Sequence, residues 1–249
     1  MKAIFLFCVF AAASFVSMAR ADDESTIDPT SATFYNNRGL LKHDQGDQDG
    51  AIADLNQAIS INPKDAMAYY NRGAAKFSKR DLPGAIADYT QAITLNPQFI
   101  KAYNNRGLAE HDKGDQDAAI ADYDQALQLD PKSAVTYSNR GLAKRSKGDL
   151  DGAIADETQA VTLNPKDAKA FNNRGLARHD KGDEDGAIAD CNQALLLDPK
   201  LAVAYNNRGV AKRAKGDAAG AMADFNQALA LSPNDANAQA NAKSLGGTH

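Results

Sequence analysis

Apolar residues recur along this chain at the spacing of amphipathic helices, and the same pattern returns every 34 residues. Between residues 51 and 61, Ile52, Leu55 and Ile59 follow an i, i+3, i+7 spacing, which places them on one face of a helix. A shorter stripe precedes it, with Tyr35 and Gly39 four residues apart. Two helices in each period predict an all-α chain built of helical hairpins.

Four columns of residues keep the 34-residue step over six repeats. They are the glycines Gly39, Gly73, Gly107, Gly141, Gly175 and Gly209; the aromatic residues Tyr35, Tyr69, Tyr103, Tyr137, Phe171 and Tyr205; the alanines Ala51, Ala85, Ala119, Ala153, Ala187 and Ala221; and the prolines Pro63, Pro97, Pro131, Pro165, Pro199 and Pro233. A glycine inside a helix costs about 1 kcal/mol relative to alanine. Its return in every repeat predicts a second helix too close for a side chain, and we expect Gly39 to contact Ala51 and Ala58.

Capping and stop signals set the limits of the repeats. Asp47, and an aspartate at the same place in every later repeat, precedes the second helix and can cap it, whereas Pro63 cannot continue that helix. The predicted repeats are 32–65, 66–99, 100–133, 134–167, 168–201 and 202–235. Residues 236–249 are expected to form a short capping helix and tail, and residues 22–31 a flexible leader.

The aromatic residue, the glycine, the alanines and the proline, at these offsets, resemble the tetratricopeptide repeat family over residues 32–235. The resemblance implies antiparallel helix pairs stacked into a right-handed superhelical solenoid with a concave groove. The chain departs from the family pattern at Glu157 and Cys191, which stand where the second helix usually has an aromatic residue. We therefore expect repeats four and five to be the loosest.

An arginine precedes every column glycine, where the family usually has leucine, and an aspartate recurs in every second helix. In the first repeat these residues are Arg38 and Asp54. Opposite charges at fixed positions predict one ion pair inside each repeat, partly buried between its two helices.

The amino terminus has the features of a secretory signal peptide. Lys2 precedes an apolar run over residues 3–16, and residues 19–21 form a small-x-small cleavage site. We predict removal of residues 1–21, with cleavage after Ala21 and export to a bacterial periplasm or the cell exterior. An uncleaved membrane anchor is the alternative, but the apolar run is shorter than the roughly 20 residues that a spanning helix needs.

Charge and cysteine content narrow the choice of partners. Cleavage would remove Lys2 and Arg20, so the 28 basic residues fall to 26 against 32 acidic residues, a net charge of −6. An acidic chain disfavours nucleic acid and anionic membranes as partners. Loss of Cys8 would leave Cys191 as the one cysteine, which excludes an internal disulfide, and we interpret it as an unreactive core residue.

Candidate chemistry is sparse. His43, His111 and His179 occupy one column, each followed by an aspartate, a combination that occurs in metal sites and catalytic dyads. Helices of successive repeats are expected to pack about 8–10 Å apart, so histidines two repeats apart lie roughly 20 Å from one another and cannot share an ion. We interpret them as solvated residues on a helix face, and predict no metal, no cofactor and no enzymatic activity.

The family resemblance implies that ligands bind the first helix of each repeat at its positions 2, 5, 9, 12 and 13. Odd and even repeats differ there, so this surface repeats every 68 residues. The predicted partner-binding residues are Asn36, Leu40, His43, Asp44, Tyr70, Phe77, Lys101, Asn104, Leu108, His111, Asp112, Leu142, Arg145, Lys169, Asn172, Leu176, His179, Asp180, Asn206 and Arg213.

We therefore expect a non-enzymatic scaffold that binds a peptide or protein segment in the concave groove. The alternative is a small-molecule or glycan-binding envelope protein, but the chain has no tryptophan and only two aromatic residues, Tyr70 and Phe77, are assigned to the groove. A hydrolase or transferase would need a further catalytic domain beside the repeats. The sequence does not indicate an oligomeric state.

Overall fold

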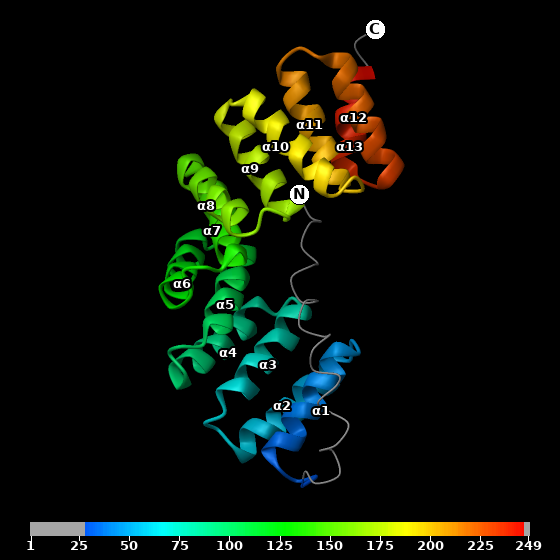
Figure 1. Ribbon diagram of the computed structural model, residues 1–249. Helices are drawn as coiled ribbons and strands as arrows, with labels where there is room; N and C mark the ends of the chain where they lie inside the picture. Colours follow the sequence, from blue (N-terminus) through cyan, green and yellow to red (C-terminus); the bar gives the residue numbers. More distant parts are fainter. Residues whose placement is uncertain (1–27, 247–249) are drawn as a thin grey trace. The chain divides into compact units, whose positions relative to one another are not determined.

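The computed structural model describes residues 28–246, and within that range it contains thirteen α-helices and no strands (Figure 1). The predicted all-α repeat fold is confirmed. The helices are α1 (Ala32–Asp44), α2 (Gln48–Ile61), α3 (Ala66–Ser78), α4 (Leu82–Leu95), α5 (Ile100–Lys113), α6 (Gln116–Leu129), α7 (Ala134–Lys147), α8 (Leu150–Leu163), α9 (Ala168–Lys181), α10 (Glu184–Leu197), α11 (Ala202–Ala214), α12 (Ala218–Leu231) and α13 (Ala236–Gly246). The predicted signal peptide, residues 1–21, lies outside the described residues. Between residues 28 and 246, no helix is both long and apolar enough to cross a membrane.

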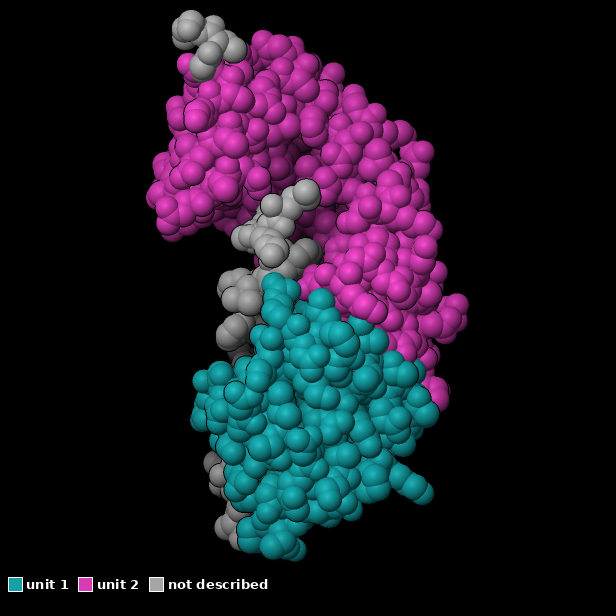
Figure 2. Space-filling model, turned by 180° about the vertical axis from the view of Figure 1, so that it is seen from behind, with its two compact units in different colours: residues 1–96 teal, residues 97–249 magenta. Residues whose placement is uncertain are grey.

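The chain divides into two compact units, residues 1–96 and residues 97–249 (Figure 2). Unit 1 contains α1–α4, which are repeats one and two, and unit 2 contains α5–α13, which are repeats three to six and a final helix. In every repeat the first helix, called the A helix, packs on the second, called the B helix. Inside each unit the B helix also packs on the A helix that follows, and α13 packs on α12.

The aspartates before the B helices act as N-caps. Asp47 accepts a hydrogen bond from the backbone N–H of Gly50, and the equivalent bond is present in all six repeats. Ser31 caps α1 in the same way. The expected flexible leader overlaps the described residues at 28–31, and there the chain forms a hydrogen-bonded turn that leads into α1.

The glycine column marks a close approach of the A and B helices, as predicted. A Cβ atom on Gly39 would lie 2.8 Å from Cγ of Leu55 and 3.2 Å from the carbonyl oxygen of Ala51. Ala58, the second expected contact, is not among the nearest neighbours. Its column serves the next repeat instead, because the equivalent Ala160 packs against α9.

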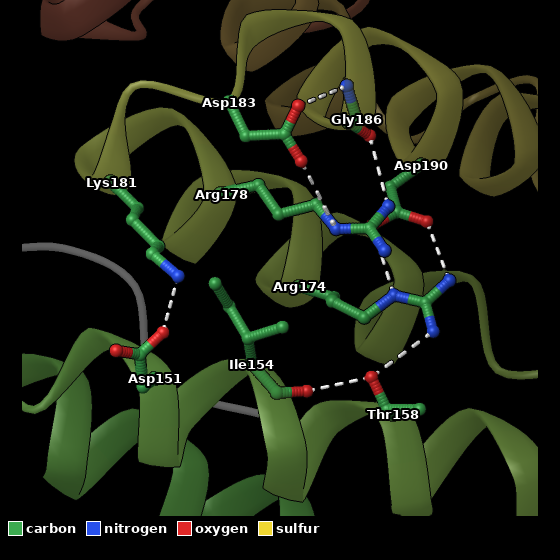
Figure 3. A network of polar contacts seen from close by, with 9 residues as sticks. All are labelled: Asp151, Ile154, Thr158, Arg174, Arg178, Lys181, Asp183, Gly186 and Asp190. Atoms are coloured by element: carbon green, nitrogen blue, oxygen red, sulfur yellow. Dashed lines mark hydrogen bonds and ion pairs between the residues drawn. The ribbon is translucent and has the colours of Figure 1, made fainter.

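The six predicted ion pairs are confirmed. In repeat five, Nε and Nη2 of Arg174 donate to the two carboxylate oxygens of Asp190 at 2.9 and 2.7 Å (Figure 3). The same two-bond contact joins Arg38, Arg72, Arg106, Arg140 and Arg208 to Asp54, Asp88, Asp122, Asp156 and Asp224, respectively. All six aspartates are buried, and each guanidinium lies over the aromatic ring of its own repeat. The paired bonds offset the cost of burying the carboxylate.

The same arginines also link successive repeats. Nη1 of Arg174 donates to the hydroxyl of Thr158 in the preceding repeat at 3.4 Å, and Lys181 binds Asp151 nearby (Figure 3). Equivalent arginine contacts join Arg72 to Asn56, Arg140 to Asp124 and Arg208 to Asn192. One guanidinium therefore stabilises both its own hairpin and the contact with its neighbour.

The single substitution Arg140→Leu is expected to destabilise the protein more than a double variant in which both Arg140 and Asp156 are replaced by apolar residues. The single variant leaves the buried Asp156 paired with Lys144 alone among the described residues, whereas the double variant removes the stranded charge. We expect the single variant to unfold with a free energy about 2–3 kcal/mol lower than that of the wild type.

Urea unfolding followed by circular dichroism measures this difference. Lys147→Leu serves as the control, because its ion pair with Asp117 is exposed to solvent and should contribute little to the free energy of unfolding. Equal free energies for the single and double Arg140 variants would contradict the prediction.

Candidate functional site

The A helices line the inner side of each unit. In unit 2, α5, α7, α9, α11 and α13 contact one another in succession, and α1 contacts α3 in unit 1. Within either unit, the backbones of successive described B helices lie farther apart than those of successive A helices. A stack whose A helices lie closer together than its B helices curves toward the A helices. All the predicted partner-binding residues lie on A helices, and we call the surface that they form in unit 2 the A-helix face.

The predicted residues differ in exposure. In unit 1, Asp44 is exposed, and the half-buried residues are Asn36, Leu40, His43, Tyr70 and Phe77. In unit 2, the exposed residues are Lys101, Lys169 and Asp180, and the half-buried ones are Asn104, Leu108, His111, Asp112, Leu142, Arg145, Leu176, His179 and Arg213. Asn172 and Asn206 are only 5% and 7% exposed, so these two residues serve mainly to support the face.

Asparagine side chains join successive A helices. Nδ2 of Asn207 donates to Oδ1 of Asn172 at 2.9 Å, and Nδ2 of Asn241 donates to Oδ1 of Asn206 at the same distance. In unit 1, Asn71 donates to Asn36 at 3.0 Å. Asn71 and Asn207 each precede the repeated arginine, and Asn241 lies 34 residues after Asn207. These donors were not among the predicted site residues. Their 34-residue column was the signal in the sequence that could have identified them.

Charged groups on the A-helix face are partly paired with one another. Nε of Arg145 on α7 lies 2.5 Å from Oδ2 of Asp180 on α9. Nη1 of Arg213 donates to the hydroxyl of Ser244 on α13 at 2.9 Å. A ligand that binds Arg145 or Asp180 must therefore compete with an existing ion pair.

The three histidines of one column were interpreted from the sequence as solvated residues on a helix face, and the structure shows them only partly exposed. His43, His111 and His179 are half-buried, and Nδ1 of each contacts the side chain of the first residue of the following B helix, which is Gln48, Gln116 or Glu184. These contacts orient the rings within the helical hairpins. In the described part of the chain, no group of three or more His, Cys, Asp or Glu residues could hold a metal ion.

Cys191 is a buried residue of unit 2, as interpreted from the sequence. Its side chain is fully buried, and burial raises the pKa of the thiol to about 12. The thiolate is the reactive form of cysteine, so this thiol is unreactive while the repeat is folded.

Repeat three lacks a second cation that binds the buried aspartate in the other five repeats. Nζ of Lys76 lies 2.8 Å from Asp88 in repeat two, and a lysine or arginine binds the equivalent aspartate in repeats one, four, five and six. Repeat three has Glu110 at this place, beside Asp122. Burial and the charge of Asp122 raise the pKa of Glu110 to about 7. A folded state with a raised carboxyl pKa loses stability as the pH rises from 4.5 to about 7.

Glu110→Lys is therefore expected to stabilise the protein at about pH 8. The lysine removes the repulsion with Asp122 and restores the ion pair seen at Lys76. Because Glu110 is only half-buried, we expect a gain of about 1–2 kcal/mol in the free energy of unfolding, measured by urea denaturation. The reverse change, Lys76→Glu, should destabilise, and a variant Glu110→Lys no more stable than the wild type would contradict the prediction.

Sequence profiles of one known family match most of the chain. A profile described as TPR repeat matches residues 39–80, 107–144 and 141–182. Profiles described as tetratricopeptide repeat match residues 66–99, 168–201 and 202–235. The chain therefore belongs to the tetratricopeptide repeat family, whose members generally bind protein or peptide partners. No match was found among curated proteins.

Solved structures share the fold at low sequence identity. PilW, a type IV pilus biogenesis factor, is 19% identical over 84% of this chain and 97% of PilW, with a TM-score of 0.76. A chain of the APC/C hetero-tetramer Cut9–Hcn1 is 21% identical with a TM-score of 0.74; the match covers 87% of this chain but 43% of that one. YrrB, a TPR protein, is 24% identical over 76% of this chain and 97% of YrrB, with a TM-score of 0.59.

Proposed function

We propose that this protein is a non-enzymatic scaffold that holds an extended peptide or protein segment against the A-helix face. The observation that carries the proposal is the line of asparagine amides along the A helices. Asn207 and Asn241 each use one N–H bond to reach the preceding A helix. A primary amide has a second N–H and a carbonyl oxygen, and these match the N–H and C=O groups of an extended peptide backbone.

Side chains beside this line would select the sequence of the segment. Lys101, Val135 and Lys169 occupy the second position of α5, α7 and α9, and all three are exposed. Lysines that flank an exposed valine suit a segment with acidic residues on either side of an apolar one. The structure of YrrB is described as having an unusual peptide-binding site, and its shared fold supports a peptide as the ligand.

Substitutions on the A-helix face should weaken peptide binding. The face variant carries His111→Ala, Arg145→Ala and Leu176→Ala on α5, α7 and α9, and its matched control carries Gln125→Ala, Gln159→Ala and Gln193→Ala on α6, α8 and α10. Peptides are selected with the wild-type protein from a displayed random library and measured by fluorescence anisotropy. We expect at least a roughly tenfold loss of affinity in the face variant and little change in the control.

Other outcomes would contradict this proposal in distinct ways. Loss of affinity in the control variant alone would move the binding site to the B helices. Failure to select any peptide would favour the small-molecule or glycan alternative. Circular dichroism of both variants first shows whether their helix content equals that of the wild type.

The proposed place of action is the bacterial cell envelope. It is supported by the apolar run over residues 3–16 and the cleavage motif at residues 19–21. Expression of the full chain in a bacterium should yield a mature protein that begins at Asp22 in the periplasmic fraction or the medium. Amino-terminal sequencing checks this, and an intact amino terminus in the membrane fraction would favour the uncleaved anchor.

A further inference from the structure

Glu157 occupies a position that is apolar or aromatic in the other repeats. The equivalent residues are Leu55, Tyr89, Tyr123, Cys191 and Phe225, and all of them are buried. Glu157 is 1% exposed. Its Cγ and Oε1 atoms would lie 3.2 and 3.3 Å from a Cβ on Gly141, so the carboxyl side chain fills the space that a ring or an aliphatic group fills elsewhere.

The carboxyl group connects three helices through hydrogen bonds. The hydroxyl of Ser138 on α7 donates to Oε1 of Glu157 on α8 at 3.0 Å. Nδ2 of Asn173 on α9 donates to the same Ser138 hydroxyl at 3.3 Å, so Asn173 is linked to the carboxyl through Ser138. The other carboxyl oxygen, Oε2, is buried and has no hydrogen-bond partner among the described residues. Repeats four and five therefore meet at a buried acid.

The surrounding charges favour the neutral form of this acid. Within unit 2, α8 packs on α7 and α9. The nearby cations of α7, Arg140 and Lys144, bind Asp156, and those of α9, Arg174 and Arg178, bind Asp190. The charges that act on Glu157 come from Asp156 and Asp167, and both are negative. Burial is the main cause that raises the pKa of Glu157 well above its ordinary value of 4.5. The polar side chains of Ser138 and Asn173 oppose this rise, and the two carboxylates add to it, so the net direction is upward.

We propose that Glu157 is a proton-dependent latch between repeats four and five. The protonated carboxyl fills the contact of α7, α8 and α9 without bringing a charge into it. Loss of the proton buries a charge with no cationic partner among the described residues, and this cost loosens the contact although Ser138 still donates to the carboxyl. The latch does not depend on the proposed function, since it holds whether or not the A-helix face binds a peptide.

The direction of the pH effect follows from proton binding. The folded repeat keeps a proton that the opened repeat releases once the pH exceeds 4.5. Between that pH and the higher pKa of the folded state, the closed form loses stability relative to the open form by up to tenfold per pH unit. Below pH 4.5 the carboxyl is protonated in both forms, so the latch has no pH dependence there.

Hydrogen exchange of the full chain, read by mass spectrometry, tests the latch. Amide exchange rates in α7–α9 are measured for the wild type and for Glu157→Gln at each pH. The rate of the wild type is divided by the rate of the variant, because this ratio cancels the intrinsic pH dependence of exchange. We expect this ratio to increase with pH by up to tenfold per unit above 4.5, with no such trend in α12. A ratio that stays constant from about pH 4 to about pH 9 would overturn the proposal.

Two further variants separate the latch from general charge effects. Asp151→Asn removes an exposed carboxylate from the same helix and should keep the pH trend of the wild type. Glu157→Leu introduces the residue of repeat one and should lose the trend, which keeps the test open if Glu157→Gln folds poorly. The same trend in Glu157→Leu as in the wild type would assign the effect to another group.

Infrared difference spectra provide a readout that does not depend on opening. The spectrum of the wild type minus that of Glu157→Gln at about pH 5.5 should contain the carbonyl band of a protonated carboxylic acid. Carboxylate bands alone would show that Glu157 is ionised in the folded protein and would overturn the proposal.

Discussion

The arginine–aspartate pair is the contact on which each repeat depends. It joins the A helix to the B helix through two charge-assisted hydrogen bonds, and the third guanidinium nitrogen reaches the preceding repeat in several copies. Repeats of a solenoid contact only their neighbours, so stability is close to a sum of hairpin and neighbour terms. One side chain contributes to both terms here. A lysine could not do so, because it lacks the planar set of five donors.

The residues that depart from the repeat pattern lie at buried contacts inside the hairpins, where a change affects the stability of the solenoid most. Glu110 puts a carboxyl beside Asp122 in repeat three, and Glu157 puts one beneath Gly141 in repeat four. Cys191 in repeat five replaces a ring with a small apolar group and adds no charge. Because no distant part of a solenoid can compensate a weak hairpin, these substitutions should make repeats differ in local stability.

Several residues of the proposed binding surface, the A-helix face, also support the fold. Asn172 and Asn206 are buried acceptors for the next repeat, and Arg145 and Asp180 already form an ion pair. These contacts hold the side chains in place before a ligand arrives, which lowers the entropy that binding must offset. The family membership of the chain and its low-identity structural neighbours are consistent with a scaffold of this kind.

The sequence by itself determined the helices, their caps and the partners of the repeated arginines. Arg38 and Asp54 lie 16 residues apart in one hairpin, and the same separation returns in six copies, so the period identifies the contact. Contacts between repeats are different, because they depend on how one hairpin is rotated against the next. Only the tertiary structure decided that Asn172 is buried and that Asn173 of repeat five bonds to Ser138 of repeat four, since a spacing in the sequence does not contain that rotation.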